Sequence, residues 1–149
     1  MDYGCGTGRS GLGLKKYGFK VTHGVDGSEG MMSKIPDGLY QSKLKHLVGI
    51  NTLPSEYLDK FDLVICSGCM GPSHFPDTSL DEAHTVLKKG GFFGFDIRAS
   101  FYDESYAGCE PYRKKTEALV KEGKYKVVRE QEVEKGFSKG TELNDRLVP

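Results

Sequence analysis

The sequence predicts an α/β fold with a doubly wound, mainly parallel sheet, in a single domain that spans residues 1–149. Two observations lead to this prediction. Apolar runs of strand length alternate with amphipathic segments along the chain, which is typical of strands and helices that follow one another. A chain of 149 residues is also long enough for one hydrophobic core but short for two domains.

The expected elements follow each other in a regular order. We expect strands over residues 19–25, 44–50 and 92–97, and helices over residues 10–17, 77–89 and 113–122. Ser28 can cap a further helix, which Pro36 and Gly38 limit to about two or three turns. Gly90 and Gly91 are expected to end the helix over 77–89. Tyr125–Val133 alternates like a half-exposed antiparallel strand at the edge of the sheet.

The first strand is unusually short. A buried strand usually carries about four to eight residues, whereas Met1 directly precedes Asp2 here. We therefore expect a chain that is cut within its first strand, or one whose sheet is completed by a partner chain. At the other end, residues 146–149 are the remaining segment that could supply a closing strand.

A glycine-rich turn and a distant acidic residue together predict a nucleoside-binding site. Gly4, Gly6 and Gly8 alternate with other residues, and glycine lets a backbone turn sharply and approach a ligand closely. Asp26 ends an apolar run, where a carboxylate can accept hydrogen bonds from both hydroxyls of a ribose. The spacing G-x-G-x-G, preceded by Asp2, differs from the dinucleotide fingerprint G-x-G-x-x-G. This difference favours a ligand without phosphates.

The motif DYGCGTG, followed by GVDGSEGM, resembles motif I and the following segment of class I S-adenosylmethionine-dependent methyltransferases. FDLVICSG and VLKKGGFFGFDIRASF resemble the fourth and fifth strands of that family's Rossmann-like fold. GVDGSEGM, with GLY at residues 38–40, is most similar to the Williams-Beuren syndrome chromosomal region methyltransferase-like group.

The resemblance implies S-adenosyl-L-methionine as the cofactor and methyl transfer to an acceptor as the activity. It implies that Asp2 supports the amino group, that Asp26 holds the ribose hydroxyls, and that Met31 lies near ribose or adenine. The implied cofactor-binding residues are Asp2, Gly4, Cys5, Gly6, Gly8, Asp26, Gly27, Ser28, Met31, Ile50, Asn51, Cys66 and Ser67.

One position departs from the family pattern. Many relatives carry an acidic residue after the third strand that accepts a hydrogen bond from the adenine amino group, and this chain has Ile50 there. Asn51 or a backbone carbonyl can substitute as the acceptor. Losing one such bond costs about 1 to 3 kcal/mol when a buried partner is left unpaired.

The acceptor side is less clear from the sequence. His74 lies in the loop expected to overhang the methyl group and is the candidate catalytic base, although loop histidines are often merely exposed or structural. Tyr102, Asp103 and Tyr106 either shape an acceptor pocket or form an ordinary polar loop. His84 falls on an apolar helical face, which favours a packing role. The acceptor itself stays open between a small molecule and a protein, and so does the oligomeric state.

Cys66 and Cys69 form a C-x-x-C pair, which can be a redox pair or half of a zinc site. We favour neither, because no second pair completes a metal set and Cys66 is expected to close a buried strand. Cys5 is expected nearby, since the first and fourth strands are neighbours in this fold. With Cys109, we expect mostly reduced thiols and no metal site.

Charge and composition argue against several classes of protein. Lys plus Arg and Asp plus Glu both number 21, so nothing global attracts nucleic acid or an anionic membrane. The basic runs are most simply solvated helix ends, and nucleic-acid binding is not expected. With no membrane-spanning run and no signal peptide in view, we expect a cytoplasmic protein, with the nucleus as the alternative.

Two other functions remain in competition. A non-catalytic module that binds the cofactor or only a partner is favoured by Ile50 and by the short first strand. A nicotinamide-dependent oxidoreductase is disfavoured because Arg9 stands where the dinucleotide fingerprint needs its last glycine.

Overall fold

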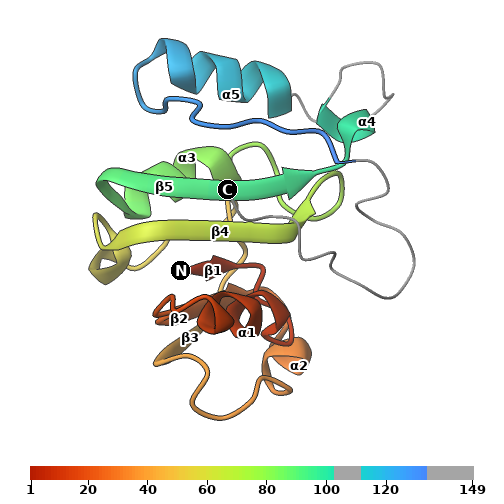
Figure 1. Ribbon diagram of the computed structural model, residues 1–149, viewed down its shortest axis with the longest axis vertical. Helices are drawn as coiled ribbons and strands as arrows, with labels where there is room; N and C mark the ends of the chain where they lie inside the picture. Colours follow the sequence, from red (N-terminus) through yellow and green to blue (C-terminus); the bar gives the residue numbers. More distant parts are fainter. Residues whose placement is uncertain (103–111, 134–149) are drawn as a thin grey trace.

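A five-stranded sheet organises the computed structural model, which describes residues 1–102 and 112–133 (Figure 1). The strands are β1 (Asp2–Tyr3), β2 (His23–Asp26), β3 (Ser42–Lys45), β4 (Phe61–Met70) and β5 (Leu87–Ile97). Their order is β3-β2-β1-β4-β5, and every neighbouring pair is parallel. This confirms the predicted doubly wound parallel sheet, with β1 at its centre.

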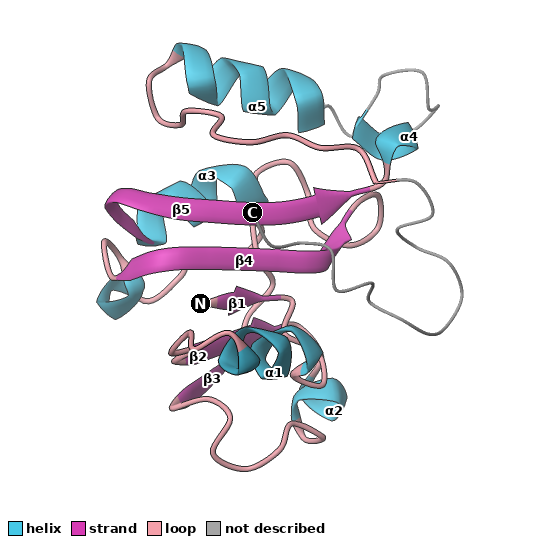
Figure 2. Cartoon of the chain, in the orientation of Figure 1, coloured by secondary structure: helices cyan, strands magenta, loops and turns pink. Residues whose placement is uncertain are grey.

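Helices cover both faces of the sheet. They are α1 (Arg9–Lys16), α2 (Glu29–Met32), α3 (Ser79–Val86), α4 (Ala99–Tyr102) and α5 (Tyr112–Lys121), with a 3₁₀ turn, η1, at Ser55–Tyr57. In Figure 2, α1 lies in front of β2 and β3, whereas α3 lies behind β5. The short first strand serves both faces, because successive strand residues point to opposite sides. Asp2 bonds to Tyr40 on one side, and Tyr3 belongs to the larger apolar core on the other.

The first strand is held in place despite having two residues. Asp2 pairs with Gly24 of β2 and with Ile65 of β4, and Asp2 and Tyr3 are both fully buried. The backbone N–H of Ile65 also donates to the carbonyl of Met1. The start of the glycine turn is therefore fixed in the middle of the sheet.

The predicted bounds of the second and third strands were wrong. Strand β2 begins at His23 rather than at Phe19, because the chain from Phe19 is still folded back on α1 through a bond from its N–H to the carbonyl of Leu14. Strand β3 ends at Lys45 rather than at Ile50. The backbone turns at Gly49, whose φ of 75° belongs to the left-handed region that interrupts a strand.

The helix predicted over 77–89 is also shorter than expected. Helix α3 ends at Val86, and β5 begins directly at Leu87. Leu87 pairs with Phe61 while Phe92 pairs with Leu63, so residues 88–91 form a bulge within the strand. The glycines at 90 and 91 therefore serve a bulge and do not end the helix.

Of the two elements predicted near the C-terminus, one is confirmed and one is wrong. The helix predicted over 113–122 is confirmed as α5, whereas the strand predicted over Tyr125–Val133 is wrong. Tyr125 is tied to α3 by its hydroxyl, which donates to the carbonyl of Leu80 at 2.9 Å, and Val128 is 73% exposed. The apolar alternation there finds no neighbouring strand among the described residues. Asp103, Tyr106, Cys109 and residues 146–149 lie outside the described part of the chain.

The described helices include none with the length and apolar character needed to cross a membrane. His84 is half-buried and meets the ring of Tyr125 edge-on at a centroid distance of 5.5 Å, which confirms its predicted packing role.

Candidate functional site

The candidate site begins at the glycine turn between β1 and α1. The backbone N–H groups of Gly4 and Cys5 both donate to the carbonyl of Val25, which ties the turn to β2. Gly4 has a φ of 69°, and a Cβ atom there would overlap the Sγ of Cys69. Gly8, with a φ of 87°, is the N-cap of α1. The turn therefore requires glycine for its backbone conformation and for its close approach to β4.

Asp26 joins the glycine turn to the next helix. One carboxylate oxygen accepts from the N–H of Gly6 at 2.8 Å, and the other accepts from the N–H of Ser28 at 2.7 Å. Ser28 in turn caps α2 by accepting from the N–H of Met31, as the sequence predicted. The two loops that follow β1 and β2 are thus fixed around one half-buried carboxylate.

Asp2 lies beneath the turn and is fully buried. Its Oδ2 accepts from the hydroxyl of Tyr40 at 2.6 Å, whereas its buried Oδ1 has no partner among the described residues. Burial raises the pKa of Asp2, and burial together with the Asp2 carboxylate raises the pKa of Tyr40. The nearby thiol of Cys5 has a pKa raised to about 12, chiefly by burial. The Oδ1 of Asp2 is therefore an acceptor with unused capacity.

Two cysteines of β4 lie on the same side of the strand near the turn. Cys66 is fully buried, and Cys69 is half-buried with its Sγ 3.4 Å from the carbonyl oxygen of Gly4. The Cys66 thiol donates to Cys69, which raises the pKa of Cys66 and lowers that of Cys69. The sequence had selected Cys66, but the structure brings Cys69 against the glycine turn. The bulge between Cys66 and Met70, which turns Cys69 inward, could not be predicted from local pattern.

Ser67 is oriented by a residue that the sequence did not indicate. Its hydroxyl donates to Oδ2 of Asp96 on β5 at 2.9 Å, and Oδ1 of Asp96 accepts from the N–H of Gly68 at 2.6 Å. Asp96 thus holds the end of β4 in an exposed position at the carboxyl edge of the sheet.

Exposed apolar side chains rim this edge. Met31 is 44% exposed, and a Cβ atom on Gly6 would come within 2.9 Å of the methyl group of Met31. Leu47 is 49% exposed, and a Cβ atom on Gly27 would come within 2.7 Å of a methyl group of Leu47. Ile50 is 65% exposed in the same loop as Leu47. Exposed apolar side chains at the edge where a ligand binds can contact the faces of a purine base. Leu47 was not predicted, because its role depends on the approach of two loops that follow different strands.

The predicted base, His74, lies on the loop after β4. Its backbone N–H donates to the carbonyl of Gly71, and its side chain is exposed. Phe75 returns to the end of β4 through an isolated bridge with Met70. Asn51, in the loop after β3, is exposed as well. The described residues contain no group of three or more His, Cys, Asp or Glu side chains suited to a metal ion.

The residues of the candidate site gather at one edge of the sheet. Parallel strands end at one edge of the sheet, next to the point where the strand order reverses on either side of β1. The glycine turn, the carboxylate of Asp26 and the exposed apolar rim all belong to loops at that edge. The orphaned Oδ1 of Asp2 fits an ammonium group, and Asp26 fits vicinal hydroxyls, so the residues present fit S-adenosylmethionine.

Comparisons with known proteins agree with this geometry. Residues 1–95 match the family model described as a methyltransferase domain. The human protein named Methyltransferase-like protein 27 is 35% identical over 107 residues, which cover 71% of this chain and 43% of that protein.

Solved structures show the same likeness. An S-adenosylmethionine-dependent methyltransferase from Mesorhizobium loti has a TM-score of 0.56 at 26% identity, covering 68% of this chain and 47% of that one. The PH0226 protein from Pyrococcus horikoshii has a TM-score of 0.50 at 27% identity, covering 63% and 47%. This chain spans less than half the length of each of these relatives. On the family match over residues 1–95, the chain belongs to the methyltransferase-domain family.

Proposed function

We propose that this chain binds S-adenosylmethionine at the carboxyl edge of its sheet and transfers the methyl group to a small-molecule or protein acceptor. The observation that carries the proposal is the double attachment of Asp26 to Gly6 and Ser28. It prepares one carboxylate between two loops, where a ribose can use the remaining lone pairs of both oxygens. The narrower resemblance to the Williams-Beuren syndrome chromosomal region methyltransferase-like group stays part of this proposal and rests on the segment GVDGSEGM with GLY at residues 38–40.

The chain's own residues would act mainly by positioning. When bound, S-adenosylmethionine supplies an electrophilic methyl group that an acceptor lone pair displaces in line from sulfur. Asp2 would hold the amino group through Oδ1, Asp26 would hold the ribose, and Met31 and Leu47 would line the base. Holding donor and acceptor near attack distance supplies roughly 7 to 11 kcal/mol of a barrier in favourable cases.

His74 remains the proposed general base. Its exposure on the loop after β4 leaves the ring open to an acceptor. His74→Ala is expected to leave cofactor binding unchanged and to slow methyl transfer to an acceptor that must lose a proton. Equal slowing of an acceptor that needs no deprotonation would contradict this role.

A specific observation also favours a second function, a non-catalytic module that binds the cofactor weakly. The side chain of Ile50 offers no hydrogen-bond acceptor to an adenine amino group and is 65% exposed. Ligand binding without turnover on any acceptor would favour this reading over methyl transfer.

The test of the proposed function is binding of S-adenosylhomocysteine, measured by calorimetry on Asp26→Ala and on a matched control. Asp62→Ala is the control, because Asp62 lies at the opposite edge of the sheet, exposed and paired with Lys88. We expect Asp26→Ala to abolish measurable binding and Asp62→Ala to bind like the wild type. Equal binding by both variants, with circular dichroism unchanged, would overturn the proposal.

A further inference from the structure

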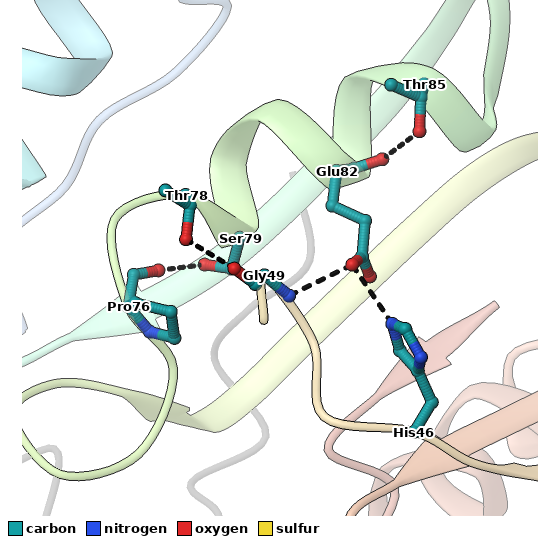
Figure 3. Close-up of polar contacts among 7 residues, drawn as sticks. All are labelled: His46, Gly49, Pro76, Thr78, Ser79, Glu82 and Thr85. Atoms are coloured by element: carbon teal, nitrogen blue, oxygen red, sulfur yellow. Dashed lines mark hydrogen bonds and ion pairs between the residues drawn. The ribbon is translucent and has the colours of Figure 1, made fainter. Parts of the chain in front are cut away.

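The loop after β3 is clamped onto helix α3 by polar contacts (Figure 3). The Oε2 atom of Glu82 accepts from the N–H of Gly49 at 2.9 Å and lies 3.0 Å from Nε2 of His46. On the other side of Gly49, the Thr78 hydroxyl donates to the glycine carbonyl at 2.7 Å. Both polar groups of one loop residue are therefore fixed by α3 and the residue that precedes it.

The His46 and Glu82 half of the clamp is largely buried, which makes it stiff. His46 is 4% exposed, and the Glu82 side chain is 10% exposed. A carboxylate that accepts hydrogen bonds away from water binds its partners more strongly than one at the surface. Backbone contact also limits the loop, because a Cβ on Gly49 would come within 2.6 Å of the Ser79 backbone nitrogen. The loop cannot shift toward α3, and pulling it away breaks its bonds to Glu82 and Thr78.

The clamp is continuous with the candidate cofactor site. The backbone N–H of His46 donates to the carbonyl of Asp26 at 3.0 Å, so the clamped segment starts beside the proposed ribose carboxylate. Burial raises the pKa of Tyr3, and the carboxylate of Glu82 raises it further. Tyr3 directly precedes the glycine turn. Glu82 thus holds the loop after β3 and interacts with the residue that precedes the glycine turn.

This arrangement bears on how the base is recognised. The family resemblance places Ile50 where many relatives carry an acidic residue for the adenine amino group, and the loop backbone or Asn51 can supply an acceptor in its place. A backbone carbonyl discriminates between bases only when its direction is fixed. The clamp fixes the backbone of Gly49, in the middle of the loop of residues 47–51, and so limits how the rest of this loop can move.

We propose that Glu82 is a positioning residue that sets selectivity for adenine, by holding the loop of residues 47–51 against α3. The inference rests on the proposed function, which it deepens. Adenine donates a hydrogen bond from its amino group where hypoxanthine presents a carbonyl oxygen. A correctly held acceptor therefore favours S-adenosylhomocysteine over S-inosylhomocysteine.

The experiment measures dissociation constants for both ligands by calorimetry on the wild-type chain and on four variants. Glu82→Ala removes the clamp, and Glu82→Gln keeps one acceptor oxygen. Asp81→Asn is the matched control, because Asp81 is the neighbouring carboxylate on α3 and pairs with Lys115 on the side of α5. Thr78→Val removes the other half of the clamp at an exposed position and serves if Glu82→Ala does not fold.

We expect Glu82→Ala to weaken the binding of S-adenosylhomocysteine about tenfold or more, and the binding of S-inosylhomocysteine much less. Glu82→Gln and Thr78→Val should lose part of the selectivity, and Asp81→Asn none. A wild type without preference, an unchanged ligand ratio in folded Glu82 and Thr78 variants, or an equal loss in Asp81→Asn would overturn the inference. If the wild type binds neither ligand, the proposed function itself fails, and the inference falls with it.

Discussion

Gly49 offers a quantitative test of how tightly the loop after β3 is packed. Gly49 and Gly18 have similar backbone conformations, with φ values of 75° and 81°. A Cβ on Gly18 would meet nothing within 4 Å, whereas a Cβ on Gly49 would meet the backbone nitrogen of Ser79 at 2.6 Å and its Cα at 3.0 Å. Alanine at either position has to adopt the left-handed region, which costs about 1 to 2 kcal/mol.

The two substitutions separate backbone strain from steric overlap. Alanine also reduces the entropy of the unfolded chain, by a similar amount in both variants. Overlap with backbone atoms cannot be relieved by rotating a side chain, so it adds roughly 1 to 3 kcal/mol at Gly49. We therefore expect the free energy of unfolding to fall by about 2 to 5 kcal/mol in Gly49→Ala and by about 1 to 2 kcal/mol in Gly18→Ala.

Urea unfolding followed by circular dichroism measures both differences, provided that the slopes with denaturant agree. A Gly49→Ala variant that is no less stable than Gly18→Ala would refute the reasoning. The loop would then lie farther from α3 than the contacts of Thr78 and Glu82 require.

Two further predictions concern the buried groups of the site. Burial raises the pKa of Asp2 above its ordinary 3.8, so the folded chain binds a proton on the Asp2 carboxyl group more readily than the unfolded chain does. The stability that this bound proton contributes is therefore lost as pH rises through the folded-state pKa. Asp2→Asn should lack that decline in stability when urea midpoints are compared across pH. An identical pH dependence in the wild type and in Asp2→Asn would contradict the prediction. Iodoacetamide should modify Cys69 before Cys5 or Cys66, because the Cys66 thiol lowers the pKa of the half-buried Cys69. S-adenosylhomocysteine should slow that modification, as followed by mass spectrometry, and faster labelling of Cys66 would count against the geometry.

The order of the elements could be predicted because it depends on short-range signals. The glycine turn, Ser28 as a helix cap, and the acidic residue at the end of β2 each have a local physical reason that the sequence carries. Asp26 was therefore found together with its position at the carboxyl edge. The helix of residues 113–122 likewise follows from its own amphipathic pattern.

The remaining features depend on contacts between distant segments. Strand β3 stops early because α3 holds Gly49, and residues 88–91 form a bulge because Leu87 already pairs with Phe61. Tyr125–Val133 alternates like a strand but has no strand beside it among the described residues. Periodicity within a segment carries no information on such partners.

The site residues missed by the sequence have the same explanation. Cys69, Asp96 and Leu47 each contact a segment that belongs to another strand or to the loop after it. One signal could have found Asp96 in advance, since an acidic residue near the end of a parallel strand lies at the edge where ligands bind. For Leu47, the residue type alone predicts burial rather than the 49% exposure that the structure gives.

The most direct test of the central claim is a calorimetric titration of the wild-type chain with S-adenosylhomocysteine, and separately with a nicotinamide dinucleotide. The account predicts saturable binding of S-adenosylhomocysteine at one site and no binding of the dinucleotide, because the glycine turn lacks the spacing that receives a pyrophosphate. Binding of the dinucleotide alone, or of neither ligand by the folded chain, would contradict the account.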